Sequence, residues 1–324
     1  MTDSFARKHT YLRLAVTDRC NLRCQYCMPA EGIDFSPRAD LLTYEEMLRL
    51  TGLFQQNGLK KVRLTGGEPL ARKGIETLIA RLNEQDLSVY VTTNGVLLDD
   101  FSATLKSKKI AGLNISLDTL NPEKFFTITR RDNFADVWRN LQMVIDLGIP
   151  TKLNMVVMAG MNDDELIPFA ELAKEMPIGV RFIEAMPFNA GDGNRSTYLS
   201  AAAIEATMRG AFPALAPAIN DAHAAADRYQ IPGWAGSIGI IPAYTRSLCG
   251  RCNRLRLTPK GRLLNCLYTQ DGLELLPLLR QGIQDDELLD LVQAYLNTKA
   301  VNGHEAERLA GRANAYASMT TIGG

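Results

Sequence analysis

The chain has 324 residues, of which 46% are hydrophobic and 22% are charged, so it can bury a large core. Lysine plus arginine and aspartate plus glutamate each number 36, which excludes a nucleic-acid binder that depends on a broad basic surface. A local basic pocket for a small anion is still compatible with this balance. Residues 1–10 are charged and polar, and no run approaches the ~18 apolar residues of a membrane span, so a cytoplasmic protein without membrane association is expected.

Short β-type runs alternate with helical patterns in the first half of the chain. The predicted strands share a richness in Val, Ile, Leu and Thr and cover Tyr11–Thr17, Lys61–Thr65, Ser88–Thr93, Gly112–Leu117, Lys152–Met158 and Gly179–Glu184. Six successive β/α units imply a parallel sheet with right-handed crossovers. Doubly wound and barrel arrangements both fit. Because a full barrel has eight units, the expected fold class is α/β with an incomplete TIM-type β/α barrel.

Helix ends are marked in several of the intervening segments. Thr43 followed by Glu46 matches a capping box, and Asp163 or Asp164 is expected to cap a helix that runs through Lys174. Residues 135–147 repeat apolar side chains at helical spacing and stop before Gly148.

The pattern changes after Glu184. Residues 187–195 are rich in Asn and Gly and predict a loop, and the Ala-rich residues 201–226 are expected to be partly helical. The elements predicted beyond them are a strand at 236–244, a hairpin of 254–258 and 262–266, and helices at 273–281 and 285–298. A boundary near residue 190 is expected to divide the chain into a barrel at 1–190 and a C-terminal region at 191–324.

The six cysteines form two groups of three, one near each end of the chain. The groups are Cys20, Cys24 and Cys27, and Cys249, Cys252 and Cys266. Disulfides are not expected in a protein without a secretory signal. Two groups of three therefore suggest two metal sites.

The first group has CxxxCxxC spacing and follows the first predicted strand, at the end where β/α folds place their active sites. Three thiolates can hold three irons of a four-iron cluster and leave one iron open, whereas a structural zinc site normally has four protein ligands. The three histidines, His9, His223 and His304, are not paired at metal-ligand spacing. An open iron–sulfur cluster is therefore favoured over zinc.

This spacing, with Tyr26 before the third cysteine, resembles the radical S-adenosylmethionine (SAM) superfamily. The segment from Thr65 to Pro69, Thr-Gly-Gly-Glu-Pro, resembles the GGEP element of the same superfamily and follows in the expected order. Glycines let the backbone approach a neighbouring group closely. The resemblance implies a 4Fe–4S cluster whose open iron binds SAM, and SAM cleavage to methionine and a 5′-deoxyadenosyl radical.

The second group, CxxC followed by thirteen residues and a third cysteine, matches three quarters of a zinc ribbon, but it has no fourth ligand. Next to it, Arg254 and Arg256 alternate with Leu255 and Leu257, so on a strand the two guanidiniums share one face. Paired guanidiniums bind phosphate well. A second open cluster beside an anion site is favoured over a solvated edge strand.

Together these features resemble the MoaA family of radical SAM GTP 3′,8-cyclases, lyases that begin molybdenum-cofactor biosynthesis. The resemblance runs from Arg13 through Cys266 and includes the C-terminal Gly323-Gly324 pair. It implies SAM contacts at Tyr26, Gly67, Ser116 and Met186. It also implies GTP contacts at Arg13, Arg63, Thr92, Lys152, Arg254 and Arg256. Catalytic roles are implied for Arg13, Arg254, Arg256, Gly323 and Gly324.

The resemblance further implies that guanine binds the open iron of the second cluster, and that a ribose C3′ radical attacks C8 of guanine. The product would be (8S)-3′,8-cyclo-7,8-dihydroguanosine 5′-triphosphate. Implied partners are a reductant such as flavodoxin and a downstream cyclic pyranopterin monophosphate synthase, with the chain a monomer or homodimer. Two alternatives stay open: a peptide-modifying radical SAM enzyme with an auxiliary cluster, and a non-catalytic iron–sulfur or zinc protein.

Overall fold

The computed structural model describes residues 1–107, 110–186, 197–245, 249–269, 271–310 and 322. Within them, twelve strands form one sheet in the order β12-β11-β10-β1-β2-β3-β4-β5-β6-β9-β8-β7. The loop expected at 187–195, the boundary predicted near residue 190, and Gly323 and Gly324 lie outside the described residues.

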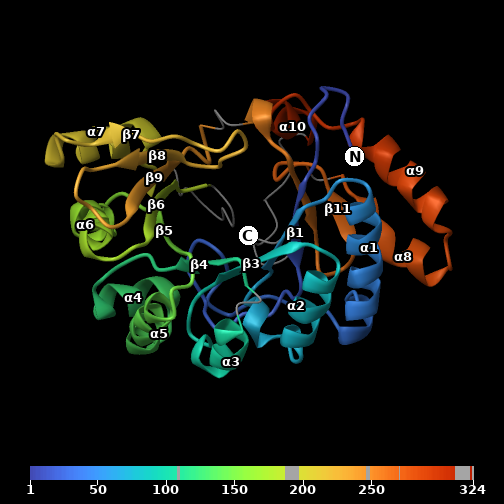
Figure 1. The fold of residues 1–324 in the computed structure, drawn as a ribbon, viewed down its shortest axis with the longest axis horizontal. Coiled ribbons are helices and arrows are strands. Elements are labelled where there is room, and N and C mark those ends of the chain that lie inside the picture. The colour runs from blue at the N-terminus through green and yellow to red at the C-terminus, as the bar shows by residue number, and fades with distance from the viewer. Residues whose placement is uncertain (108–109, 187–196, 246–248, 270, 311–321, 323–324) are drawn as a thin grey trace.

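The first six strands pair in parallel, each with the next along the chain. They are β1 (Tyr11–Ala15), β2 (Lys61–Thr65), β3 (Ser88–Thr93), β4 (Gly112–Ser116), β5 (Thr151–Val157) and β6 (Gly179–Glu184). The sheet curves without closing on itself, which confirms the incomplete barrel (Figure 1).

Six helices lie in the connections between these strands, two of them between β4 and β5, and form an arc around the outside of the sheet (Figure 1). They are α1 (Tyr44–Gln56), α2 (Ile75–Glu84), α3 (Ser102–Lys106), α4 (Pro122–Thr129), α5 (Phe134–Asp146) and α6 (Leu166–Glu175). Alternate strand residues such as Leu12, Leu14, Val62 and Leu64 are fully buried and belong to the apolar core. The residues between them face the barrel interior.

The capping box of Thr43 and Glu46 is confirmed, because both of its hydrogen bonds form. The expected cap at Asp163 or Asp164 is wrong. Asp163 accepts a hydrogen bond from Gly160 N at 2.7 Å, and Asp164 binds Lys124. Glu165 instead occupies the N-cap of α6, without a side-chain cap bond, and accepts hydrogen bonds from the Thr119–Leu120 segment.

The second half of the chain extends the same sheet at both edges. Its elements are α7 (Ala201–Ala211), β7 (Ala216–Pro217), β8 (Asp227–Gln230), β9 (Ser237–Ile241), β10 (Arg254–Leu257), β11 (Arg262–Leu264), β12 (Leu273–Glu274), α8 (Leu275–Arg280), α9 (Asp285–Leu296) and α10 (Gly303–Ala310). Strand β9 pairs in parallel with β6, and β10 pairs in parallel with β1. The helix expected from Leu273 begins at Leu275, because the two residues before it pair with β11.

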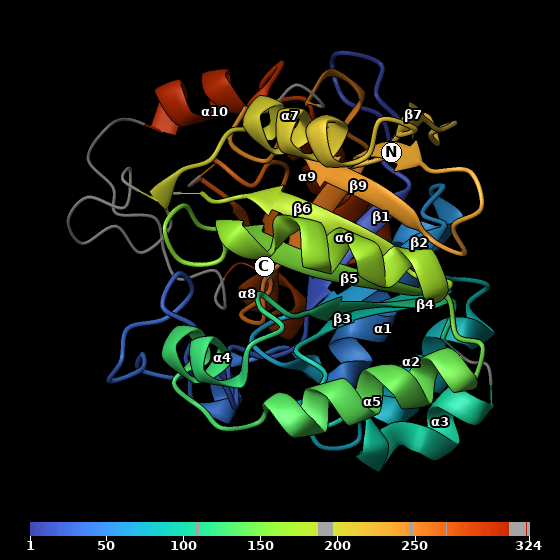
Figure 2. The ribbon, with the colours of Figure 1, turned by 90° about the vertical axis from the view of Figure 1, so that its left-hand side faces the viewer.

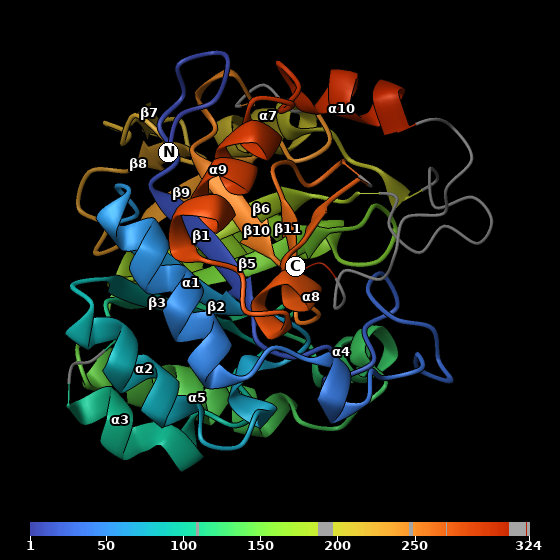
Figure 3. The ribbon, with the colours of Figure 1, turned by 90° about the vertical axis from the view of Figure 1, so that its right-hand side faces the viewer.

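Two side views place the helices against the sheet. Helix α6 lies over β5 and β6 (Figure 2), and α1 lies beside β1 and β2, with α8 and α9 next to it (Figure 3). Short 3-10 turns occupy Arg38–Asp40, Pro69–Ala71, Asp99–Phe101, Asp163–Glu165 and Cys249–Arg251. Among the helices of the described segments, none is both long and apolar enough to cross a membrane.

Candidate active site

The first cysteine group forms a tight turn after β1. The amides of Cys27 and Met28 both donate to the carbonyl oxygen of Cys24, each at 2.9 Å. All three cysteines are partly buried. Burial raises the pKa of Cys24 well above its ordinary value, and the charges of Asp118, Cys27 and Cys20 raise it further. The three thiols therefore lie close enough to affect one another, as the ligands of one cluster must.

The two glycines of the GGEP element lie directly against this turn. A Cβ on Gly66 would come within 2.2 Å of the Thr17 carbonyl oxygen, and one on Gly67 within 2.3 Å of the Arg19 carbonyl oxygen. The amides of Gly67 and Glu68 donate to these same two oxygens at 2.9 and 2.8 Å. Side chains at both positions would push the cysteine turn away, so the glycines are needed to position it.

The buried carboxylate of Glu68 is linked to the first cysteine group through Asn94. Glu68 accepts hydrogen bonds from Thr93 Oγ1 at 2.9 Å and from the Asn94 amide at 2.8 Å. Asn94 Nδ2 in turn lies 3.8 Å from Cys20 Sγ. Burial raises the pKa of Glu68 to about 7.

Tyr26, the aromatic residue before the third cysteine, donates from its hydroxyl to Asp118 Oδ2 at 2.8 Å. The other oxygen of Asp118 accepts the Val156 amide of β5. Burial raises the pKa of Asp118 to about 6. Tyr26 is therefore fixed to the ends of two strands. Neither Asp118 nor Glu68 was assigned a role from the sequence, although Glu68 belongs to the GGEP element and Asp118 follows β4.

In the second cysteine group, Cys249 and Cys252 precede β10, and Cys266 follows β11. Cys249 to Arg251 form one 3-10 turn, and the Cys252 amide donates to the Cys249 carbonyl oxygen at 3.1 Å. Burial alone would raise the pKa of Cys252, but the positive charges of Arg254 and Lys299 lower it to about 7. Burial and the charges of Cys266 and Cys252 raise the pKa of Cys249. These thiols also lie close together, and one of them is readily deprotonated for metal binding.

Three thiol side chains in each group match the donor set of an iron–sulfur cluster with one open iron. Within the ranges that the structure describes, no three or more His, Cys, Asp or Glu side chains converge as ligands of a single metal ion. A cluster makes a different demand, because each thiolate binds its own iron. The residues present therefore fit a cluster in both groups.

Basic side chains cover the barrel interior between the two groups. Arg13 is paired in register with Arg63 on one side and with Arg256 on the other. Burial and the charges of Arg63 and Arg254 lower the pKa of Arg13 to about 10, and burial with Arg13 and Arg254 lowers that of Arg256 to about 9. Buried positive charges that lie this close to one another create a positive potential that favours the binding of an anion.

Two further cations on this face, Lys61 and Arg181, were missed in the sequence. Lys61 lies 3.9 Å from the ring centroid of Tyr90. Burial and the charge of Arg63 lower the pKa of Arg181 to about 10. The alternation that identified Arg254 and Arg256 would have found Lys61, since Lys61 and Arg63 also share one face of a strand, whereas Arg181 has no basic neighbour two positions away on β6.

The cysteine groups lie at opposite ends of this basic face. The first group follows the C-terminal end of β1, whereas Cys252 precedes the N-terminal end of β10, which runs parallel to β1. A five-residue strand spans roughly 16 Å. The two cysteine groups are therefore separated by about the length of this strand, with the arginines of β1 and β10 between them.

Comparisons with known proteins agree with this arrangement. Residues 14–173 match the Radical SAM superfamily, and residues 178–305 match Molybdenum Cofactor Synthesis C. The chain is 41% identical to "GTP 3′,8-cyclase" of Heliobacterium modesticaldum over 331 aligned residues, which cover 100% of both chains. The chain belongs to the GTP 3′,8-cyclase family. It is also 42% identical to the human "Molybdenum cofactor biosynthesis protein 1" over 302 residues, covering 92% of this chain and 48% of that protein.

The chain thus spans about half the length of the first curated relatives that it matches. Among solved structures, SuiB of Streptococcus suis superposes with a TM-score of 0.66, covering 96% of this chain and 76% of SuiB. At 13% identity this likeness shows a shared fold alone. Membership of the GTP 3′,8-cyclase family, in contrast, follows from sequence identity over the whole chain.

The structure also fixes the register of residues that family resemblance implied. Thr92 lies on the interior face, 3.4 Å from Arg63 Nη1, whereas Thr93 is buried and bonded to Glu68. Lys152 is paired in register with Asn114 of β4, on the same face. Thr92 and Lys152 therefore lie on the interior face and Thr93 does not, and the GTP contacts of Thr92 and Lys152 stay predictions.

Ser116 and Met186, the other two residues implied to contact SAM, have different surroundings. Ser116 ends β4 and is paired in register with Asn154. Met186 accepts a hydrogen bond from the Tyr268 hydroxyl at 3.3 Å and packs in a small apolar cluster with Cys266. Met186 is therefore close to the second cysteine group, and its SAM contact stays a prediction.

Proposed function

We propose that this chain is a radical SAM lyase that cyclises GTP by joining ribose C3′ to guanine C8, the first step of molybdenum-cofactor biosynthesis. The observation that carries the proposal is the basic face of Arg13, Arg63, Arg254 and Arg256 between two groups of three cysteines. Family membership supports the same activity. A triphosphate needs such a face, whereas a peptide substrate has no evident use for it.

Two 4Fe–4S clusters would be held by Cys20, Cys24 and Cys27, and by Cys249, Cys252 and Cys266. When bound, SAM and the clusters supply the deoxyadenosyl radical and the electron that the reaction needs. Gly67 and Tyr26 position the first cysteine turn, where SAM would bind. Arg254 and Arg256, with Arg13, would hold the triphosphate so that the guanine faces the second group.

The decisive experiment is anaerobic reconstitution with iron and sulfide, followed by SAM, reductant and GTP. We expect 5′-deoxyadenosine that depends on GTP, together with a product isomeric with dihydro-cyclised GTP by mass spectrometry. Deoxyadenosine formed regardless of GTP would keep the radical SAM chemistry and overturn the substrate. No deoxyadenosine from protein loaded with both clusters would favour the non-catalytic alternative.

The affinity for GTP is expected to fall as the pH rises through about 8. Burial and the charges of Arg181 and Lys61 lower the pKa of Lys152 to about 8, so its positive charge is present below that pH and lost above it. Isothermal titration with GTP from pH 7 to 9 measures the change. Lys152→Arg should flatten the profile, because arginine stays protonated.

Tyr11 ionises in the same pH range as Lys152, so its contribution to the pH dependence of GTP affinity must be separated from that of Lys152. Although burial opposes ionisation, the neighbouring Arg63, Arg13 and Lys61 lower the pKa of Tyr11 to about 8 as well. A Tyr11→Phe variant serves as the control, since it removes this ionisation and leaves that of Lys152. A profile that is flat in Tyr11→Phe and unchanged in Lys152→Arg would contradict the assignment.

The flavodoxin-type reductant, the downstream synthase, the oligomeric state and the cytoplasmic location stay predictions. So do the catalytic roles of Gly323 and Gly324.

A further inference from the structure

The N-terminal loop of residues 1–9 contains a buried ionic cluster, consisting of Asp3, Arg7 and His9, that the proposed reaction does not use. Arg7 Nε donates to Asp3 Oδ2 at 2.7 Å, and the side chains are 8% and 0% exposed. His9 Nε2 lies 3.1 Å from the same oxygen. Burial and the charge of Lys299 lower the pKa of His9 to about 4, so His9 is neutral at physiological pH. Arg7 is thereby held in one orientation by a carboxylate whose charge it neutralises.

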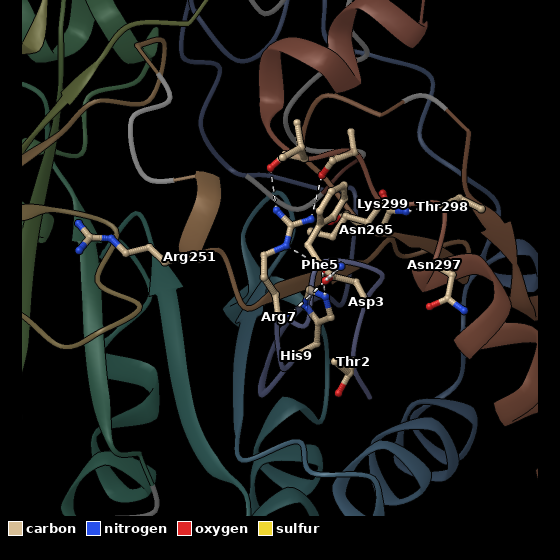
Figure 4. Close-up of polar contacts among 12 residues, drawn as sticks. Thr2, Asp3, Phe5, Arg7, His9, Arg251, Asn265, Asn297, Thr298 and Lys299 are labelled. Carbon is tan, nitrogen blue, oxygen red and sulfur yellow. Dashed lines mark hydrogen bonds and ion pairs between the residues drawn. The ribbon is translucent and has the colours of Figure 1, made fainter.

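The rest of the Arg7 guanidinium joins the second cysteine group to the segment after α9. Arg7 Nη1 donates to the Cys249 carbonyl oxygen at 3.3 Å and to the Val301 carbonyl oxygen at 2.8 Å. Nη2 donates to the Ala300 carbonyl oxygen at 2.9 Å. Figure 4 shows Asp3, Arg7 and His9 turned toward one another, with Lys299 and Asn265 beside them. The loop therefore fixes the ligand-bearing turn relative to residues 299–301.

Lys299 is the second part of this arrangement. It is 5% exposed and follows α9, and its ammonium donates to the carbonyl oxygen of Asn265, the residue before Cys266. Burial lowers the pKa of Lys299. The negative charges that oppose this decrease are, in order of size, those of Cys252, Cys266 and Asp3. The ammonium therefore binds the residue next to Cys266 and lies within electrostatic range of Cys252 and Cys266.

A buried ammonium is costly unless opposite charge compensates it. Asp3 is already engaged by Arg7, and His9 is neutral. The thiolates that would hold a bound cluster would provide the missing charge. Three thiolates on an oxidised 4Fe–4S core leave one net negative charge, and reduction adds a second. Lys299 therefore interacts more favourably with the reduced cluster than with the oxidised one.

We propose that Lys299 is a positioning residue for the second cluster that raises its reduction potential, and that the Asp3–Arg7–His9 loop holds Lys299 and Cys249 in place. This inference rests on the proposed second cluster. It gives the N-terminal loop and Lys299, which follows α9, a part in electron transfer.

Potentiometric titration followed by electron paramagnetic resonance tests the charge. The full chain is used, alone and with serine at Cys20, Cys24 and Cys27 to isolate the second cluster. In Lys299→Met, we expect the ratio of reduced to oxidised second cluster at a fixed potential to fall about tenfold, equivalent to about 59 mV for one electron. Lys299→Arg should keep the wild-type potential. Lys60→Met, which removes an exposed lysine, is the matched control.

An unchanged potential in Lys299→Met, or an equal fall in Lys299→Arg, overturns the charge effect. Arg7→Met tests the loop independently, and we expect its second cluster to lose iron to a chelator faster than its first. Equal loss from both clusters overturns the role of the loop. Wild-type protein that binds iron for one cluster alone overturns this inference together with the proposed second cluster. Two clusters without GTP-dependent turnover overturn the proposed function and leave this inference standing.

Discussion

Serine in place of Cys24 is expected to abolish deoxyadenosine formation, whereas serine in place of Cys252 should leave SAM cleavage measurable and abolish the cyclised product. The reason is that the two cysteine groups lie at opposite ends of the basic face, and the GGEP segment is hydrogen-bonded to the residues that lead into the first. Each variant should retain about half of the wild-type iron, because each loses one cluster. Iron and sulfide analysis and mass spectrometry of the nucleosides measure both results.

Each variant serves as the control for the other, because each keeps one cysteine group intact. Deoxyadenosine from Cys24→Ser would place SAM at the second group. A normal yield of cyclised product from Cys252→Ser would remove the second cluster from the reaction.

Methionine in place of Arg256 is expected to weaken GTP binding by about 10- to 150-fold, from the loss of about 1.5–3 kcal/mol for hydrogen bonds to a charged group. The same change should raise the unfolding temperature of the ligand-free protein. Arg256 lies beside Arg13 and Arg254, and burial together with these like charges lowers its pKa to about 9. Removing the guanidinium relieves that repulsion while the methionine still packs.

Isothermal titration with GTP and calorimetric unfolding without it measure the two effects. Arg209→Met is the control, because Arg209 lies on the exposed face of α7 in an ion pair with Glu205. An Arg256 variant that binds GTP normally, or that melts earlier without ligand, would contradict the assignment of this face as a triphosphate site.

The strands of the barrel were predictable because their sequences are short apolar runs closed by turn residues. The bounds of β2, β3 and β6 agree with the prediction at both ends. The cap of α6 was not predictable, because Asp163 and Asp164 have tertiary or loop partners that compete with capping. Helix α8 begins late for a similar reason, since its expected first turn pairs with β11.

The candidate site was predictable where its residues form motifs and not where it is assembled from distant segments. Both cysteine groups and the Arg254–Arg256 pair are local patterns. The contact of Arg7 with Cys249 joins residues 242 positions apart, and no local pattern reports it. Which of Thr92 and Thr93 faces the barrel interior depends on the orientation of β3, and the hydrogen bond from Thr93 to Glu68 shows that Thr92 is the one that does.

The pairing of β10 with β1 has a consequence for biosynthesis. Strand β1 receives this neighbour only after residues 254–257 have been made. Until then one edge of β1 exposes unpaired amides and carbonyls, a surface on which nascent chains associate wrongly. The arginines of β10 reach Arg13 at the same late moment. Assembly of the basic face, and protection of the growing polypeptide from aggregation, therefore depend on a single strand-pairing event that must wait for β10.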